Sequence, residues 1–203
     1  MKKANKRREE IINAARELFQ TKEYEKVTMQ ELVDTLNIVK GTIHHYFSSK
    51  KDLLEAVVED LVDEELRKKE DVMNSCKGRN LNALDTMQVL LTADTASEDH
   101  EHMLDMLHHP GNIKIHARQL GRYLTKLAPL YAVVIEDGCT QGIFSTEHPL
   151  ESAEFLLAGI KFLTDVGLNP WSEEQLVQRA EAFPALVEAF LNAPKGSFSF
   201  LAE

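Results

Sequence analysis

Residues 40–46, with the sequence KGTIHHY, combine several side chains that can form hydrogen bonds. The polar members of this segment are Lys40, Thr42, His44, His45 and Tyr46. An ammonium or a phenol can reach a phosphate oxygen, whereas hydroxyl and imidazole groups can bond to the edges of bases. Ile43 and Phe47 are four residues apart, which places both on one face of a helix. The spacing predicts a short helix that buries one face and presents polar groups on the other.

A second short helix is expected immediately before this segment. Thr28 can act as its N-cap, and Glu31, three residues later, would complete a capping box. Asn37 tolerates the left-handed conformation of a sharp turn, and Ile38 can anchor that turn in a core. Two short helices joined by a tight turn are the layout of a helix-turn-helix whose second helix enters the major groove. On pattern alone, a surface helical hairpin with solvated polar side chains is an equal alternative.

The first 60 residues or so resemble the DNA-binding signature of the TetR family of bacterial transcriptional regulators. The similarity lies in IINAARELFQTKEYEKVTMQELVDTLNI at 11–38 and in KGTIHHYFSSKKDLLEAV at 40–57. The residues that we expect at the DNA interface are Thr28, Met29, Gln30, Lys40, Gly41, Thr42, His44, His45, Tyr46, Lys50 and Lys51. The departures from the family pattern are Leu36-Asn37 for a common Ala-Gly pair, Val39 for a capping Ser, and His44 for a frequent Tyr. Because Val39 cannot cap, the second helix should begin less firmly.

Charge is distributed unevenly along the chain, whose formal net charge is −10. Residues 1–51 hold 11 Lys and Arg against 7 Asp and Glu, whereas residues 52–203 hold 12 against 26. A basic head on an acidic body is attracted to phosphate only through the head. This pattern favours DNA binding by the head alone, with an affinity that falls as salt rises.

Composition favours an all-α protein, because Gly and Pro are few and no alternating strand pattern occurs. No run of about 18 apolar residues is present, so we expect no membrane span. The basic start at 1–8 is not followed by an apolar segment and is not expected to be a signal peptide. Cys76 and Cys139 lie far apart without metal-like spacing, which favours reduced thiols in a cytoplasmic protein.

The domain organisation predicted from these patterns is a DNA-binding head over 1–51 and a helical body over 52–203. Helix 1 should run from about 6 to 21, and a stiff connecting helix should start near 50. The further helices of the body are expected over about 81–95, 97–109, 112–142, 149–167 and 172–192. Pro129 and Pro184 lie inside two of them and should interrupt or kink them. The apolar tail at 198–201 is expected to dock on the body or on a partner chain.

The resemblance implies a small-molecule cavity enclosed by the helices over 81–142. Its expected wall residues are Met87, Leu90, Leu91, Met103, Met106, Leu107, His116, Leu120, Tyr123 and Leu127. Methionine side chains adapt to irregular apolar ligands, although an ordinary packed core explains the same pattern. The resemblance also implies a homodimer, formed by the helices at 149–167 and 172–192 as a four-helix bundle with their symmetry mates. The alternative is that both helices belong to the core of one chain.

Histidines cluster in the middle of the chain, and Glu98, His102, Asp105 and His109 share one helical face at spacings of four, three and four. Such nitrogen and oxygen ligands can hold a divalent metal. This face lies opposite the apolar stripe, so we expect it to face solvent and predict no metal and no cofactor. His116 is a better candidate for contact with an effector, and a haem ligand there is a further alternative.

These observations predict a cytoplasmic, homodimeric regulator rather than an enzyme. Its partners would be double-stranded DNA and a small molecule of unknown identity, which would release it, as a repressor, from a palindromic operator. The competing hypothesis is a helical metalloenzyme that uses the histidines and carboxylates of 98–116. That hypothesis lacks a closed ligand triad and a nucleophile, and it leaves the basic head unexplained.

Overall fold

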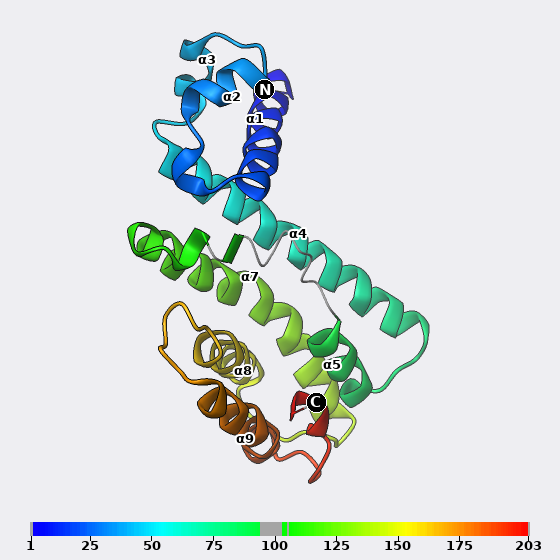
Figure 1. The fold of residues 1–203 in the computed structure, drawn as a ribbon. Helices are drawn as coiled ribbons and strands as arrows, with labels where there is room; N and C mark the ends of the chain where they lie inside the picture. The colour runs from blue at the N-terminus through cyan, green and yellow to red at the C-terminus, as the bar shows by residue number, and fades with distance from the viewer. Residues whose placement is uncertain (1, 94–102, 105, 203) are drawn as a thin grey trace. The chain divides into compact units, whose positions relative to one another are not determined.

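The computed structural model describes residues 2–93, 103–104 and 106–202, and every regular element in these ranges is a helix (Figure 1). The α-helices whose two ends both lie within these ranges are α1 (Lys2–Thr21), α2 (Met29–Thr35), α3 (Lys40–Tyr46), α4 (Lys50–Gly78), α5 (Ala83–Thr92), α7 (Ile113–Thr140), α8 (Pro149–Leu163) and α9 (Glu173–Leu191). The same ranges contain the 3₁₀ turns η1 (Tyr24–Lys26) and η2 (Pro110–Asn112), which lie between α-helices, and η3 (Ser199–Ala202), which follows α9. Between α5 and η2, residues 103–104 and 106–108 are also helical. The all-α class is therefore confirmed.

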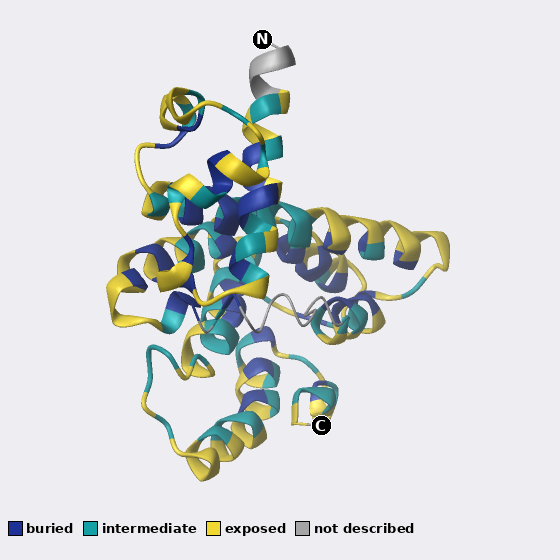
Figure 2. Ribbon diagram, turned by 45° about the horizontal axis from the view of Figure 1, so that its top comes forward, coloured by how far each residue is buried: buried dark blue, intermediate teal, exposed yellow. Residues whose placement is uncertain are grey.

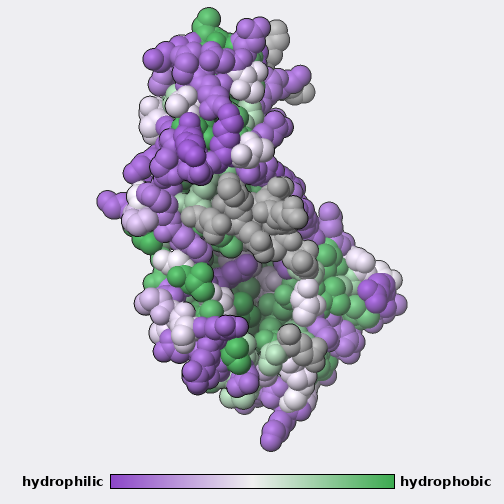
Figure 3. All heavy atoms as spheres, in the orientation of Figure 1, coloured by the Kyte–Doolittle hydropathy of each residue, from purple (hydrophilic) through white to green (hydrophobic). Residues whose placement is uncertain are grey.

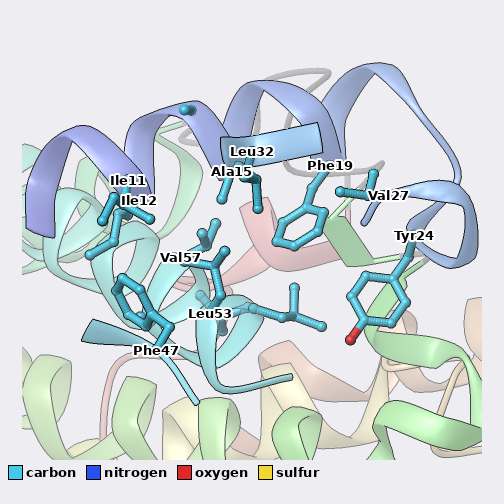
Figure 4. Packing of buried hydrophobic residues seen from close by; sticks show 14 of the residues in the cluster. Ile11, Ile12, Ala15, Phe19, Tyr24, Val27, Leu32, Phe47, Leu53 and Val57 are labelled. Atoms are coloured by element: carbon cyan, nitrogen blue, oxygen red, sulfur yellow. The ribbon is translucent and has the colours of Figure 1, made fainter. Parts of the chain in front are cut away.

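The chain divides into two compact units, of which the first comprises Met1–Val62 and Ala96–Gln119. Ile11, Ala15 and Phe19 recur every four residues along α1 and are fully buried. Their side chains point toward Leu53 and Val57 of α4 (Figure 4). This apolar stripe is the physical reason why α1 packs on the start of α4.

Helices α2 and α3 complete the core of the first unit through one fully buried side chain each, Leu32 and Ile43. Phe47, just after α3, is 2% exposed, so the predicted inward spacing of Ile43 and Phe47 is confirmed. Residues from the middle of the chain join the same core; these are Met103, Met106, Leu107 and Ile115. On the visible face of α1–α3 hydrophilic side chains dominate (Figure 3).

The second unit comprises Asp63–Thr95 and Leu120–Glu203. Lys69 is only 4% exposed, and its ammonium donates to the carbonyls of Leu90 at 2.6 Å and Ala93 at 3.1 Å. The Tyr131 hydroxyl also donates to the Leu90 carbonyl, at 3.2 Å. These bonds satisfy carbonyls at the end of α5 that have no partner within the helix. Buried polar groups thus fix α4, α5 and α7 of this unit to one another.

The carboxyl-terminal tail docks on its own chain. Phe198 is fully buried, and the centroid of its ring lies 6.0 Å from that of Phe144. The backbone N–H of Phe198 donates to the carboxylate of Glu188 in α9 at 3.1 Å. A Cβ at Gly138 would lie 2.1 Å from an atom of the Phe144 ring, so only glycine fits there. The predicted docking of the tail is confirmed for the body of the same chain.

Buried and exposed residues alternate along the helices, so that each helix buries one face and exposes the other (Figure 2). Pro129 and Pro184 lie inside α7 and α9, and both helices continue through them.

Cys76 and Cys139 are free thiols. Within the described ranges, no helix combines the length and apolarity needed to cross a bilayer.

Candidate DNA-binding interface

The turn between α2 and α3 has the geometry that its sequence predicts. Asn37 adopts a positive φ of 49°, and its N–H donates to the Asp34 carbonyl at 3.2 Å. Ile38 follows, half-buried against the core of the first unit. A residue in the left-handed region allows the chain to reverse within a few residues, and the apolar side chain after it fixes the turn. The two helices therefore form the expected helix-turn-helix.

Only half of the predicted capping box forms at the start of α2. The Thr28 hydroxyl accepts from the N–H of Glu31 at 3.1 Å, as an N-cap should. The Glu31 carboxylate does not return to Thr28 but pairs with the ammonium of Lys22. The second half of the predicted box was wrong because Lys22, the residue after α1, offers the carboxylate a cation. The pairing also ties α1 to α2.

Helix α3 presents Lys40, His44 and His45 away from the core, because Ile43 occupies its buried side. Lys40, His44 and His45 are exposed, whereas Tyr46 is half-buried, with its ring 5.1 Å from that of His45 in an edge-to-face arrangement. Gly41 is exposed and Thr42 is half-buried. Gln30 of α2 is exposed, whereas Met29 is half-buried and packs on the core. Val39 precedes α3 as its N-cap and makes no side-chain capping bond, as expected.

Lys50 has a different role from the free phosphate donor that its sequence position suggests. Its ammonium donates to the carbonyls of Tyr24 at 2.7 Å, Val27 at 2.9 Å and Glu25 at 3.3 Å. It also lies 4.3 Å from the centroid of the Tyr24 ring. Burial lowers the pKa of Lys50, and burial raises the pKa of Tyr24 to about 12. In this structure Lys50 holds the η1 segment that leads into α2.

Lys51 likewise bonds within the first unit. Its ammonium donates to the carbonyl of Gly111 in η2 at 3.0 Å, and the side chain is otherwise exposed. An exposed lysine can exchange such a bond for one to a phosphate oxygen. A role in DNA binding therefore stays a prediction for both lysines, but it would disrupt fewer bonds at Lys51 than at Lys50. Lys51 would give up one bond, whereas Lys50 would give up three.

The residues predicted to line an effector cavity fall into two groups. Met103, Met106, Leu107 and His116 are buried in the first unit, and the three apolar ones belong to its core. Met87, Leu90, Leu91, Leu120, Tyr123 and Leu127 belong to the second unit, where Leu91 and Leu120 are half-buried and the others are buried. The predicted set is thus divided between the two units, and its enclosure of a single cavity stays a prediction.

A hollow of about 200 Å³ lies between α7 and α8 of the second unit. Its lining residues are Leu120, Gly121, Tyr123, Leu124, Leu157, Ala158, Lys161 and Phe162. Leu120 and Tyr123 were predicted as wall residues, whereas the contribution of α8 was missed. The four-residue step from Leu157 to Lys161 was the available signal, because it places an apolar and a basic residue on one face.

Of the predicted metal candidates, Glu98, His102 and Asp105 lie outside the described residues. The Nδ1 of His109 accepts from the N–H of Gly111 at 3.2 Å, and its Nε2 lies 3.5 Å from Glu25. His116 is fully buried, and its ring centroid lies 5.1 Å from that of His108. His109 thus acts as a cap for the η2 turn.

Comparison with known families covers both the helix-turn-helix and much of the remaining chain. The family described as "Bacterial regulatory proteins, tetR family" matches residues 11–57, and "Tetracyclin repressor-like, C-terminal domain" matches residues 95–186. The HTH-type transcriptional repressor KstR2 of Rhodococcus jostii is 23% identical over 151 residues, which are 72% of each chain. The HTH-type transcriptional regulator YfiR of Bacillus subtilis is 36% identical over 64 residues, or 32% of this chain and 31% of its own.

Solved structures share the fold over nearly the whole chain. A transcriptional regulator from Cytophaga hutchinsonii superposes with a TM-score of 0.64 at 22% identity, covering 91% of this chain and 96% of its own. The regulator RolR, solved in complex with resorcinol, superposes with a TM-score of 0.65 at 16% identity, covering 100% and 95%. Together with the helix-turn-helix geometry and the two family matches, these similarities show that this chain belongs to the TetR family of bacterial transcriptional regulators.

Proposed function

We propose that this regulator represses transcription as a homodimer on a palindromic operator in the cytoplasm, and that a small molecule bound in its body releases it. The observation that carries the proposal is α3, whose buried Ile43 directs Lys40, His44 and His45 outward. A short helix with this arrangement can enter the major groove while α2 lies against the sugar-phosphate backbone of the DNA. The name of the R. jostii relative, a transcriptional repressor, supports repression as the direction of control.

A dimer is part of the proposal because a single recognition helix contacts few base pairs. Two such helices about 34 Å apart would read successive turns of the operator. Apolar side chains on α8, α9 and the segment between them support a partner surface there. The exposed ones outside the hollow between α7 and α8 are Phe155 at 68%, Val166 at 55%, Val177 at 50% and Leu186 at 58%. Large apolar residues grouped in this way are typical of interaction surfaces.

Ligand control follows from the same dimer. A ligand that binds one arrangement of the two bodies more tightly than the other shifts the population between them. When the distance between the two heads changes, the two recognition helices can no longer both fit successive major grooves of the operator, and the affinity for DNA falls. RolR, which shares the fold, was solved with resorcinol, and this supports a small molecule as the type of effector.

The test is selection of the DNA site in vitro, followed by binding titrations and measurement of the molar mass in solution. We expect a palindromic site and a dimeric mass. Phe155→Glu should give monomers and lose operator affinity, because one head then binds alone. Lys114→Glu, an exposed change on α7, is the control and should keep the dimeric mass. Tight binding to a single half-site by a monomeric wild type would contradict the proposal.

A further inference from the structure

The hollow between α7 and α8 has an apolar wall and a single charged side chain. Leu120, Leu124, Leu157 and Phe162 provide most of the wall. Lys161 is the only ionisable cation among the eight lining residues. All of them belong to the second unit, so the site is contained within one compact part of the chain. An apolar surface with one polar group that fixes orientation is the usual composition of a small-molecule site.

The ammonium of Lys161 is held at the hollow by an aromatic ring. It lies 4.7 Å from the centroid of the Tyr123 ring, which attracts a cation through its π face. In the part of the chain that the structure describes, no carboxylate forms an ion pair with Lys161. The side chain is half-buried, so its charge is only partly solvated. A positioned cation with a solvation deficit favours an anionic partner.

Tyr123 contributes its ring but not its hydroxyl. The hydroxyl is hydrogen-bonded to Glu65, and burial together with the charge of Glu65 raises the pKa of Tyr123 well above its ordinary value. The phenol therefore stays protonated and donates to Glu65. This leaves the ring face for the Lys161 ammonium and makes that ammonium the polar group open to a ligand.

We propose that this hollow binds a small apolar carboxylate, whose carboxylate pairs with Lys161 while its hydrocarbon part lies against Leu120, Leu124 and Leu157. The proposal deepens the proposed function, on which it rests for the effector role of this ligand. A charge-assisted hydrogen bond to the ammonium supplies orientation, and burial of hydrocarbon supplies most of the affinity. Neutral molecules of the same shape would lose the charged contact.

The chain offers two variants that test the site in different ways. Lys161→Met keeps an unbranched, apolar side chain of similar length but removes the charged ammonium. Gly121 lines the hollow, and a Cβ there would meet no atom within 4 Å, so we expect Gly121→Leu to fill part of the hollow without a clash. Replacing a glycine inside α7 also favours the helix, so loss of binding could not be attributed to unfolding. Lys114→Met removes one exposed cation elsewhere on α7 and is the matched control.

The measurement is calorimetric titration of the full chain with 3-phenylpropionate and with the neutral 3-phenyl-1-propanol. We expect the acid to bind at least about tenfold more tightly than the alcohol, and Lys161→Met to remove this difference. Gly121→Leu should abolish binding of both, whereas Lys114→Met should change neither. Equal affinities for acid and alcohol, or an unchanged Lys161→Met, would overturn the proposal. A hollow covered by a second copy would overturn it too, and would appear as a change in dimer dissociation with Gly121→Leu.

Operator binding is measured separately, so that the two proposals can fail independently. Acid binding that depends on Lys161 but leaves operator affinity unchanged would uphold the site and overturn its effector role. Normal operator binding without acid binding would overturn the site and uphold the DNA-binding function. Release of the operator by the acid in wild type, and its loss in Lys161→Met, would support both.

Discussion

The ammonium of Lys50 lies 4.3 Å from the ring centroid of Tyr24 and donates to the carbonyl of the same residue at 2.7 Å. Two further carbonyls, of Glu25 and Val27, accept from the same group. The three carbonyls belong to the segment that precedes the N-cap of α2, Thr28. Lys50 is the first residue of α4, so one side chain links the start of α4 to the start of the helix-turn-helix.

Lys50→Met should therefore lower stability without removing a phosphate contact. Loss of hydrogen bonds to a charged group costs about 1.5–3 kcal/mol, which should appear in urea unfolding. The slope of log affinity against log salt should stay unchanged, because no counterion release is lost. Lys40→Met provides the contrast: its slope should shrink by about 0.9 while its unfolding free energy stays within about 0.5 kcal/mol. A reduced salt slope with unchanged stability in Lys50→Met would assign Lys50 to phosphate instead.

Alkaline pH should destabilise the first unit through Tyr24. Its pKa is about 12 in the folded chain against 10.0 for the free side chain. The stability that this difference supplies is complete below pH 10 and is lost as pH rises through 12, since the unfolded chain releases its proton first. At pH 11 the loss should be about 1 kcal/mol relative to pH 8.

Tyr24→Phe isolates this effect, because it keeps the ring beside Lys50 and removes the titrating group. Burial also raises the pKa values of Tyr123 and Tyr131, so some alkaline loss should persist in the variant. Urea unfolding of both proteins at pH 8 and pH 11 gives the difference. If the two proteins lost equal stability between these pH values, Tyr24 would not be a source of the pH dependence.

Val39→Ser should strengthen the start of α3. Val39 is the N-cap of this helix, makes no capping bond and is 74% exposed, so its replacement removes no core contact. A serine hydroxyl could accept from a free N–H of the first turn and stabilise the protein by about 0.5–1 kcal/mol. The unfolding midpoint and the exchange rates of the α3 amides measure the gain. Val39→Ala, which removes the same side chain without adding an acceptor, should show none of it.

The local features of the head could be predicted from the sequence because they depend on residues close together in the chain. The inward pair Ile43 and Phe47 follows from helical spacing, and the positive φ of Asn37 follows from the conformational preference of asparagine. The N-cap at Thr28 depends on a residue three positions away. These features depend on local sequence, so they can be predicted without knowing how the helices pack.

The contacts of charged side chains could not be predicted in the same way. Lys50 bonds to residues 23 to 26 positions away, and Lys51 to Gly111, which is 60 positions away. Long side chains choose among several acceptors, and the choice depends on how helices pack. The hollow escaped prediction for a related reason: its α8 wall contributes Lys161, which a pattern centred on 81–142 does not include.

Substitutions of His45 and of Tyr46 should affect DNA binding differently, although the centroids of the two rings lie only 5.1 Å apart. His45 is exposed on α3 and can bond to a base edge, whereas Tyr46 is half-buried against the core, and we expect its hydroxyl to donate to a phosphate. His45→Ala should change the order of preference among duplexes that differ at one base pair, by about 1–3 kcal/mol at the contacted position. Thr42→Ala should do the same at its own position. Tyr46→Phe keeps the ring against His45 and should weaken all duplexes alike. Anisotropy titrations against a panel of single-base variants separate the two patterns, and a uniform loss from His45→Ala would remove it from the recognition surface.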